Sequence, residues 1–388
     1  MPSFTTGQTG THSTTGPGDV GEQGIALVGR VVFRHRADWC NVRRMPILDA
    51  DVLERIAREL FAARGVPDGD AAGIAVLLVR ANLRGHDSHG VIRIPSYVAA
   101  MKAGDLNPTP DVAVVLDTPT LAVVDGDRGF GQVVARRGIG LAMAKARAQG
   151  LSAVALRRTN HVGRLADYAE TAAAAGLLGM LWVNAPMSLN VAPWGGAARR
   201  LGTNPHAIAV PGRDGTVAMS LDFATSVVAE GKLRVKLNRG EPCAPGVMLN
   251  GRGEPSTEPR EFYGDPVGCL LTAGEHKGFG LSLAVEILAG ILSGTGAAQP
   301  TPGPVLNGTL MLCLDPARLM PLEDFHARVA DLFAFVRSAP PAAGSRGVLI
   351  PGEPEQRMER ERRAHGVPVE EETWRQIREC AEEVGVVA

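Results

Sequence analysis

The sequence has few of the features that mark secreted proteins, membrane proteins or metalloproteins. Its five cysteines stand far apart without a CxxC pair, which fits neither a disulfide framework nor a zinc site. It contains no run of about 18 apolar residues that could span a bilayer, and its first residues lack the basic-then-apolar order of a signal peptide. We therefore expect a cytoplasmic protein with no bound metal and no membrane partner.

Neither sign of charge dominates the chain. The 40 Lys and Arg residues nearly balance the 41 Asp and Glu residues, and no long basic block occurs. A protein that binds nucleic acid through its phosphates needs such a block or a basic face. Nucleic acid is therefore not an expected partner.

Four common catalytic motifs are also missing. The sequence contains no GxGxxG after a strand, no GxxxxGK[ST], no HExxH and no GxSxG. These motifs mark Rossmann domains, P-loop enzymes, zinc proteases and serine hydrolases. Their absence argues against a hydrolase or a metal enzyme.

The patterns that are present indicate a mixed α/β protein. The 388 residues, 45% of them hydrophobic, suffice for about two domains. Helical spacing predicts helices near 50–64, 70–84 and 95–104, and again after 321. Between them, short β-branched runs alternate with Ala-rich helices, which is typical of a buried sheet. The apolar stretch 276–294 predicts a further, buried helix.

These patterns predict three parts of the chain. Residues 1–45, rich in Gly, Thr and Ser, are expected to form a disordered extension. Residues 46–112 and 321–388 are expected to form a helical domain. Residues 113–320 are expected to form the mixed α/β domain.

The segment RGHDSHGVIRIP, residues 84–95, gathers titratable side chains at the exit of the second helix. Histidine exchanges protons near neutral pH, and a neighbouring Asp or Ser can fix its tautomer. Ser88 and His89 are therefore candidates for proton transfer. His86 and Asp87 fit the simpler role of helix-cap and turn residues.

Two arginines, Arg84 and Arg93, flank this motif. A guanidinium presents forked donors that match a carboxylate. Both are candidates for holding a substrate carboxylate, and Arg93 is the preferred one.

A second group of polar residues lies in RRTNHVGRLADYA, where Asn160 and His161 stand just before a predicted helix. Free N–H groups and the dipole at a helix N-terminus favour an anion or a neutral imidazole. This position suits a base or a phosphate. Thr159 or Asn160 as an ordinary cap, with His161 in the turn, explains the residues equally well.

Lys277, in GEHKGFG, stands at the start of an apolar helix. A cation there opposes the helix dipole unless an anionic ligand compensates it. Lys277 therefore indicates a phosphate or carboxylate site. The turns APWGGAARRLGTNP and LDFATS could let a dinucleotide approach the backbone, although such turns are common without a ligand.

Six segments, taken in order, resemble the malate/L-lactate dehydrogenase family. This non-Rossmann group also holds ureidoglycolate dehydrogenases, sulfolactate dehydrogenases, diketogulonate reductases and piperideine-carboxylate reductases. The segments are RANLRGHDSHGVIRIPSYVAAMKAGDLNP, VDGDRGFGQ, TNHVGRLADYA, PWGGAARRLGTNPHAIAVPG, LDFATSVVAEGK and HKGFGLSLAVEILAG. The resemblance implies an oxidoreductase with a non-Rossmann NAD(P)-binding sheet, active as a homodimer on a small 2-hydroxy or 2-oxo acid.

The resemblance also implies roles for individual residues. His89, with Ser88 beside it, matches the proton donor of diketogulonate-type members, and His161 matches the proton acceptor of ureidoglycolate-type members. The positions that match contacts to NAD or NADP are Asp222, Phe223, Ala224, Thr225, Ser226, Lys277, Asn307, Gly308 and Asn184.

The chain departs from the family pattern near the expected cofactor lid. Thr309 stands where a bulkier residue is usual, and the connection before it, SGTGAAQPTPGPV, is short. Arg199, Arg200 and Arg234 could pair with a ribose 2′-phosphate or could be surface charges, so NAD and NADP both stay open. A cyclic imino acid reductase, or a ligand-binding protein without turnover, are the alternatives to a hydroxy acid dehydrogenase.

Overall fold

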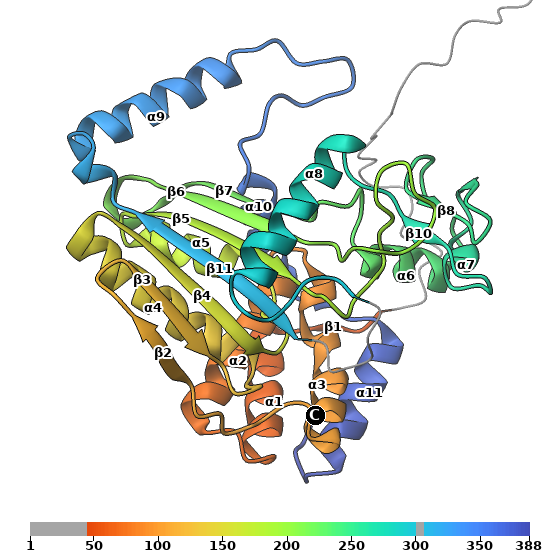
Figure 1. Ribbon diagram of the computed structural model, residues 1–388. Coiled ribbons are helices and arrows are strands. Elements are labelled where there is room, and N and C mark those ends of the chain that lie inside the picture. Colours follow the sequence, from red (N-terminus) through yellow and green to blue (C-terminus); the bar gives the residue numbers. More distant parts are fainter. Residues whose placement is uncertain (1–44, 300–305) are drawn as a thin grey trace, which may run out of the picture. The chain divides into compact units, whose positions relative to one another are not determined.

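The computed structural model describes residues 45–299 and 306–388. Residues 1–44 of the predicted extension lie outside the described residues. The described residues belong to one compact unit, in which helices from both ends of the described chain lie beside a sheet (Figure 1). No helix in the described ranges is long and apolar enough to cross a membrane.

A mixed sheet occupies the centre of this unit. Within the described residues it has seven strands in the order β2-β3-β4-β11-β5-β6-β7. Only β3 and β4 run parallel, and the other neighbours are antiparallel. The strands are β2 (Ala113–Asp117), β3 (Leu121–Asp125), β4 (Leu151–Thr159), β5 (Leu178–Asn184), β6 (His206–Pro211), β7 (Val217–Phe223) and β11 (Asn307–Leu314). A Rossmann sheet is mostly parallel, so the expected mixed, non-Rossmann α/β fold is confirmed.

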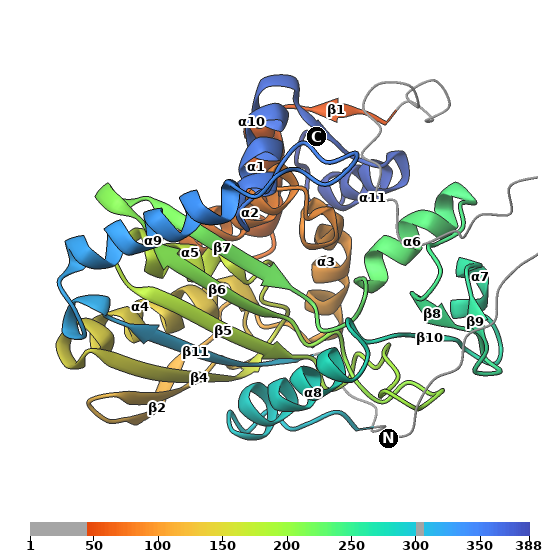
Figure 2. The same ribbon diagram turned by 90° about the horizontal axis from the view of Figure 1, so that it is seen from above.

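Small side chains allow helices to pack closely on both faces of the sheet (Figure 2). One face carries α4 (Gly131–Gln149) and α5 (Ala166–Ala174), whose buried alanines pack on β4, β5 and β6. Gly179 of β5 has no room for a side chain, because a Cβ there would lie 2.8 Å from the carbonyl oxygen of Ala169. The other face carries α8 (His276–Val285) and the π-helical turn Glu286–Ile291 that continues it.

The helical layer combines the two ends of the described chain. Its members are α1 (Ala50–Ala62), α2 (Asp68–Leu83), α3 (Ile94–Ala103), α10 (Glu353–His365) and α11 (Glu371–Glu382), with the paired strands β1 (Ile47–Leu48) and β12 (Val367–Pro368). The three predicted N-terminal helices are therefore confirmed. Asp49 caps α1 with a 2.8 Å hydrogen bond from the N–H of Asp51, and Gly104 ends α3 in the left-handed conformation. Because α2 packs on both α1 and α4, it joins this layer to the sheet.

Two further groups of elements lie at the margins. The small sheet of β8 (Met248–Leu249), β9 (Pro255–Ser256) and β10 (Cys269–Leu270) packs with α6 (Glu230–Arg239) and α7 (Pro259–Phe262). The helix α9 (Leu322–Arg337), expected in the helical domain, lies instead beside the β6–β7 hairpin, where His326 and Phe333 line a shared groove.

The prediction of a fully buried helix over 276–294 is wrong for one of its faces. Leu283, Ile287, Ile291 and Leu292 are 42%, 55%, 58% and 61% exposed. The opposite face packs on β5 and β11 as predicted. The apolar pattern of the sequence therefore does not distinguish the buried face of this helix from its exposed face.

The start of α4 meets the chain segment that carries Asn160 and His161. A Cβ on Gly131 would lie 2.3 Å from the carbonyl oxygen of His161 and 2.4 Å from that of Asn160. We expect Gly131→Ala to lower the free energy of unfolding by about 1–3 kcal/mol, because both obstacles are backbone atoms. Urea unfolding measures this change.

The matched control is Gly140→Ala in the same helix, where a Cβ meets open space. Alanine is the better helix former, so this change should stabilise the protein by up to about 1 kcal/mol. Equal midpoints for the two variants would contradict the steric argument.

Candidate functional site

The segment RGHDSHGVIRIP folds into two short 3₁₀ turns, η1 (Asp87–His89) and η2 (Val91–Arg93). The side chain of Asn82 holds both. Its amide donates to the Asp87 carboxylate over 2.7 Å, and its Oδ1 accepts from the first N–H of η2 over 2.8 Å. Gly90 is required between the turns, because a Cβ there would lie 2.1 Å from Oδ1 of Asn82.

Helix α10 supports the same turns from the other end of the chain. Arg362 donates to the two carboxylate oxygens of Asp87 over 2.6 and 3.1 Å and also binds the main-chain oxygen of Asn82. Nε2 of His86 lies 3.8 Å from a carboxylate oxygen of Glu355. Asp87 and His86 therefore anchor the turn that presents Ser88 and His89.

His89 and His161 lie side by side in the folded chain. Nδ1 of His89 is 3.1 Å from Nε2 of His161. The rings are nearly parallel, at 10°, with centroids 5.2 Å apart. Both residues are half-buried, so the fold joins the two predicted proton-transfer residues in one pair that is partly open to solvent.

Two buried side chains that the motif analysis missed stand behind His161. The hydroxyl of Tyr97 lies 2.7 Å from Nδ1 of His161, and Nε2 of Gln132 donates to that hydroxyl over 2.8 Å. The available signal was the position of Tyr97, four residues after Arg93 and in the first turn of α3. Gln132 gives no comparable signal, because it is an ordinary polar residue in the first turn of α4.

The surroundings keep both imidazoles neutral. Burial, and then the charge of Arg93, lowers the pKa of His89 to about 3. Burial, Arg93 and His89 together hold the pKa of His161 well below its ordinary value. Burial raises the pKa of Tyr97 to about 12. Near neutral pH both imidazoles are therefore uncharged, and Tyr97 keeps its proton.

Arg93 supplies the positive charge of the site. Its Nε donates to the main-chain oxygen of Ser88 over 2.7 Å, and no carboxylate of residues 45–299 or 306–388 pairs with its guanidinium. The first turn of α6 closes on Ser88, since a Cβ on Gly231 would lie 2.8 Å from Cβ of Ser88. Arg93 is therefore placed beside the histidines with donors to spare.

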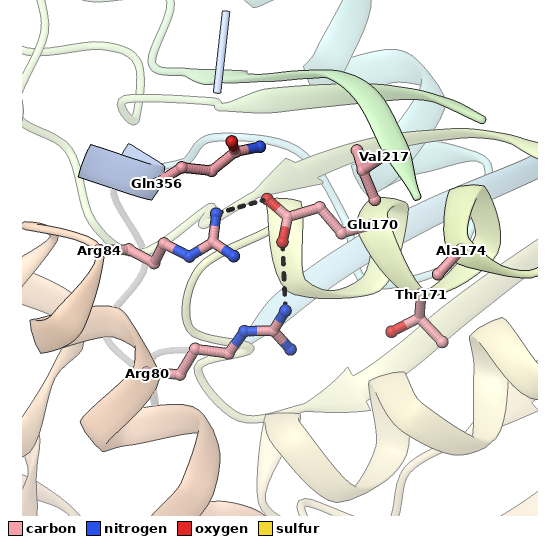
Figure 3. A pocket seen from close by; sticks show the side chains of 7 residues that line it. All are labelled: Arg80, Arg84, Glu170, Thr171, Ala174, Val217 and Gln356. Carbon is pink, nitrogen blue, oxygen red and sulfur yellow. Dashed lines mark hydrogen bonds and ion pairs between the residues drawn. The ribbon is translucent and has the colours of Figure 1, made fainter. Parts of the chain in front are cut away.

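Arg84 lies in a different environment. Its guanidinium is 3.8 Å from Glu170 and 2.5 Å from Glu359. It lines a cavity of about 280 Å³ with Arg80, which also pairs with Glu170 (Figure 3). Neither histidine of the pair lines this cavity. The arginines of this cavity are already paired with carboxylates, and the cavity is separate from the histidine pair.

Three residues that the resemblance assigns to the cofactor are buried and bound to one another. Asn307 donates to the main-chain oxygen of Asn184 over 3.1 Å, and the N–H of Gly308 donates to Oδ1 of Asn184 over 3.2 Å. Oδ1 of Asn307 accepts from the N–H of Val162 over 3.0 Å, directly after His161. These contacts hold the strand ends against the segment that carries the catalytic candidate.

The expectation that His161 stands directly before a helix is wrong. Helix α5 begins at Ala166, and the N–H of Ala166 donates to the Asp222 carboxylate over 2.8 Å. The chain first turns at Gly163, where φ is 81°. Asp222, expected at the cofactor, thus satisfies the N-terminus of α5.

The stretch Asp222–Ser226 packs against the turn that precedes α8. The N–H of Ala273 donates to the main-chain oxygen of Thr225 over 2.8 Å. The hydroxyls of Thr225 and Ser226 donate to main-chain carbonyls and are buried, whereas the ring of Phe223 is 42% exposed. Two segments expected at the cofactor therefore lie together, with Phe223 as their open side chain.

Lys277 lies in the first turn of α8, so the prediction that it begins a helix is confirmed. It is exposed, and in the described part of the chain no carboxylate pairs with it. The ring of its neighbour His276 lies 5.6 Å from the ring of Trp194. The start of α8 thus presents an uncompensated cation beside an exposed aromatic ring.

Of the three arginines considered for a 2′-phosphate, two have protein partners. Arg199 stacks on the ring of Phe262 at 4.1 Å, and Arg234 pairs with Glu230 over 2.9 Å. Arg200 is exposed and, among the described residues, donates to the main-chain oxygen of Arg199. Among the described residues, Arg200 is therefore the one of the three with neither a carboxylate nor an aromatic partner.

Comparison with known proteins adds to this geometry. A family model described as malate/L-lactate dehydrogenase matches residues 48–378. Hydroxycarboxylate dehydrogenase B of Escherichia coli is 36% identical over 343 residues, which are 87% of this chain and 94% of that protein.

Solved structures agree in fold. Sulfolactate dehydrogenase from Methanocaldococcus jannaschii superimposes with a TM-score of 0.80 at 35% identity, covering 88% of this chain and 98% of that one. Δ1-piperideine-2-carboxylate reductase from Pseudomonas syringae superimposes with a TM-score of 0.75 at 25% identity, covering 87% and 100%.

The lowered pKa values of the pair predict a pH-dependent stability. The unfolded chain protonates these histidines near pH 6.5, whereas the folded state keeps His89 neutral down to a pKa of about 3 and His161 well below its ordinary value. Their contribution is therefore complete above about pH 6.5 and lost as the pH falls below it. Each histidine can change the free energy of unfolding by at most about 1.4 kcal/mol per pH unit. The change should be smaller than this limit, because solvent reaches both half-buried rings.

Urea unfolding at a series of pH values from neutral downwards measures this slope. Replacing both histidines, His89→Gln with His161→Gln, should flatten it. His365→Gln, at an exposed position of α10, is the control. The same pH dependence in the wild type and the double variant would refute the argument.

Proposed function

Because residues 48–378 match its model, the chain belongs to the malate/L-lactate dehydrogenase family, and we propose that it transfers a hydride between NAD or NADP and a small 2-hydroxy or 2-oxo acid. The observation that carries this proposal is the contact of two neutral histidines, 3.1 Å apart, beside Arg93, whose guanidinium pairs with no carboxylate of the described residues. Oxidation of a hydroxy acid needs a base for the hydroxyl proton and a cation for the carboxylate. This site offers both.

The charges of the site residues suggest a separate role for Arg93 and for the histidine pair. Arg93 binds the substrate carboxylate and thereby fixes the α-carbon beside the histidines. The histidine pair takes the hydroxyl proton during oxidation and returns it during reduction, with Ser88 beside it. Because Arg84 is already paired with two glutamates, Arg93 is the carboxylate anchor that we propose.

The residues at the start of α8 fit an anionic cofactor. Lys277 is an exposed, uncompensated cation at a helix N-terminus, which would otherwise be unfavourable. Lys277 would hold the phosphate groups, and Phe223 would contact the cofactor from the adjoining stretch. The nicotinamide of the bound cofactor supplies or accepts the hydride.

The relatives narrow the substrate class. The relatives include a hydroxycarboxylate dehydrogenase and a sulfolactate dehydrogenase, and the substrates in both names carry a carboxylate. The match to a piperideine-carboxylate reductase supports a second candidate, reduction of a cyclic imino acid. A screen that crosses NADH and NADPH with 2-oxo acids and cyclic imino acids separates the two, and no turnover with either class would favour a ligand-binding protein.

For catalysis, we expect His161→Ala and His89→Ala each to lower turnover by about 10²- to 10⁴-fold, the usual contribution of general acid–base help. Arg93→Met should raise KM for the acid, because the carboxylate loses its cation. The change in NAD(P)H absorbance with time measures the rates of all three variants. Arg137→Met, an exposed arginine of α4, is the control. Wild-type rates in both histidine variants would rule out the proton-transfer assignment.

The proposed enzyme is a homodimer. The exposed apolar face of α8 and the π-helical turn is of the kind that a second subunit covers, and a stable interface buries about 1,200–2,000 Å² in total. We expect sedimentation of a dimer at micromolar concentration. Ile287→Glu with Ile291→Glu should give monomers, because it places charges in the apolar contact. Val52→Glu on α1, 40% exposed, should not, and a monomeric wild type would contradict the proposal.

A further inference from the structure

The hydrogen-bond chain behind the histidine pair has a defined order. It runs from Gln132 through Tyr97 and His161 to His89, with heavy-atom distances of 2.8, 2.7 and 3.1 Å. Tyr97 and Gln132 are buried, so water does not compete for these groups. The order of protons along such a chain decides which imidazole nitrogen can act on a substrate.

The first link sets the direction of the rest. Gln132 donates to the hydroxyl oxygen of Tyr97, so the Tyr97 hydroxyl hydrogen has to find an acceptor elsewhere. Of the described residues, the Nδ1 atom of His161 is the partner within reach. Nδ1 of His161 is then unprotonated, and in the neutral ring the proton sits on Nε2.

The second link carries this order to His89. Nε2–H of His161 donates to Nδ1 of His89, which places the His89 proton on its own Nε2. That nitrogen has no hydrogen-bond partner among the described residues, and it is not one of the buried unpaired polar atoms. His89 Nε2 is therefore the nitrogen of the pair left open to a substrate, whereas both nitrogens of His161 are engaged.

The amide of Gln132 could be turned the other way, which would reverse the chain. Its Oε1 has no partner as placed. An unmet carbonyl oxygen is tolerated more often than an unmet N–H, and the reversed amide would leave both of its N–H groups unmet in that position. The placement with Nε2 toward Tyr97 is therefore favoured.

We propose that Tyr97 and Gln132 are positioning residues that hold His161 as its Nε2–H tautomer and so direct the His89 Nε2–H toward the oxygen of a bound 2-oxo acid. When His89 Nε2 gives its proton to that oxygen during reduction, His161 Nε2–H passes its proton to His89 Nδ1 and the Tyr97 hydroxyl passes its own to His161 Nδ1, so both rings stay neutral; oxidation of the hydroxy acid returns all three protons. This rests on the proposed function in one respect, that the pair handles the substrate proton. The ring of Tyr97 also packs edge-on against Phe130, with centroids 5.6 Å apart. Removing only its hydroxyl therefore leaves the apolar packing in place.

The test reads the tautomer directly by ¹⁵N NMR of histidine-labelled full-length protein without substrate, with signals assigned through His161→Gln and His89→Gln. We expect an unprotonated Nδ1 on His161 in the wild type. Tyr97→Phe, and independently Gln132→Met, should convert it to a mixture of tautomers. Ser152→Ala removes another buried hydroxyl, bound to the main-chain oxygen of Ala142, and should change nothing.

Kinetics give the second readout. Tyr97→Phe should lower kcat by about 10- to 100-fold, the range known for side chains that orient a metal-binding histidine. KM for the acid should stay unchanged, because Arg93 is untouched. A protonated Nδ1 on His161 in the wild type, or a tautomer unaffected by both variants, overturns the proposal. The expected tautomer without turnover on any acid would instead support the hydrogen-bond order and overturn the proposed function.

Discussion

The pairing of β11 with β4 and β5 is the contact on which the rest of the structure depends. This strand comes late in the chain but lies in the middle of the sheet, so the sheet is complete only when segments far apart in sequence have met. Its first residue, Asn307, binds the N–H of Val162 and the main-chain oxygen of Asn184. The strand that completes the sheet therefore also fixes the connection that carries His161.

The other half of the site depends on a contact between the two ends of the described chain. Asn82 shapes the turns around His89 from the N-terminal side, and Arg362 of α10 holds Asp87 from the C-terminal side. These contacts fix His89, and the contacts of Asn307 fix the segment of His161, so the two imidazoles meet. Because burial and Arg93 disfavour a positive charge there, the fold maintains two neutral bases beside a cation, which suits a substrate that brings its own negative charge.

Local signals in the sequence predicted the features that depend on neighbours in the chain. Asp49 marks the start of α1 and Gly104 the end of α3, as expected, because caps act within one turn. The start of α5 was misplaced, since the carboxylate that caps it comes from Asp222, far along the chain.

The resemblance indicated His89 and His161 separately, but no pattern could show their contact. Tyr97 and Gln132 were missed because each occupies an ordinary helical position, and only the assembled layers give them a function. For Asn184 and Asn307, the structure adds the positioning contacts that motif matching does not contain.

A buried carboxylate connects the helix that carries Lys277 to the segment that carries His161. Glu286, in the π-helical turn after α8, accepts from Asn184 over 3.0 Å and from Asn204 over 2.8 Å. Asn184 in turn binds Asn307, which holds the segment next to His161. Gly290 and Gly308 make room for this arrangement, since a Cβ on either would lie 2.2 Å from Asn184 Nδ2 or from the oxygen of Ala289. The helix that presents Lys277 and the segment that presents His161 are therefore joined by side-chain hydrogen bonds within the core rather than by a loop. In the proposed dehydrogenase, this buried connection would hold the hydride carrier and the proton acceptor at one fixed separation.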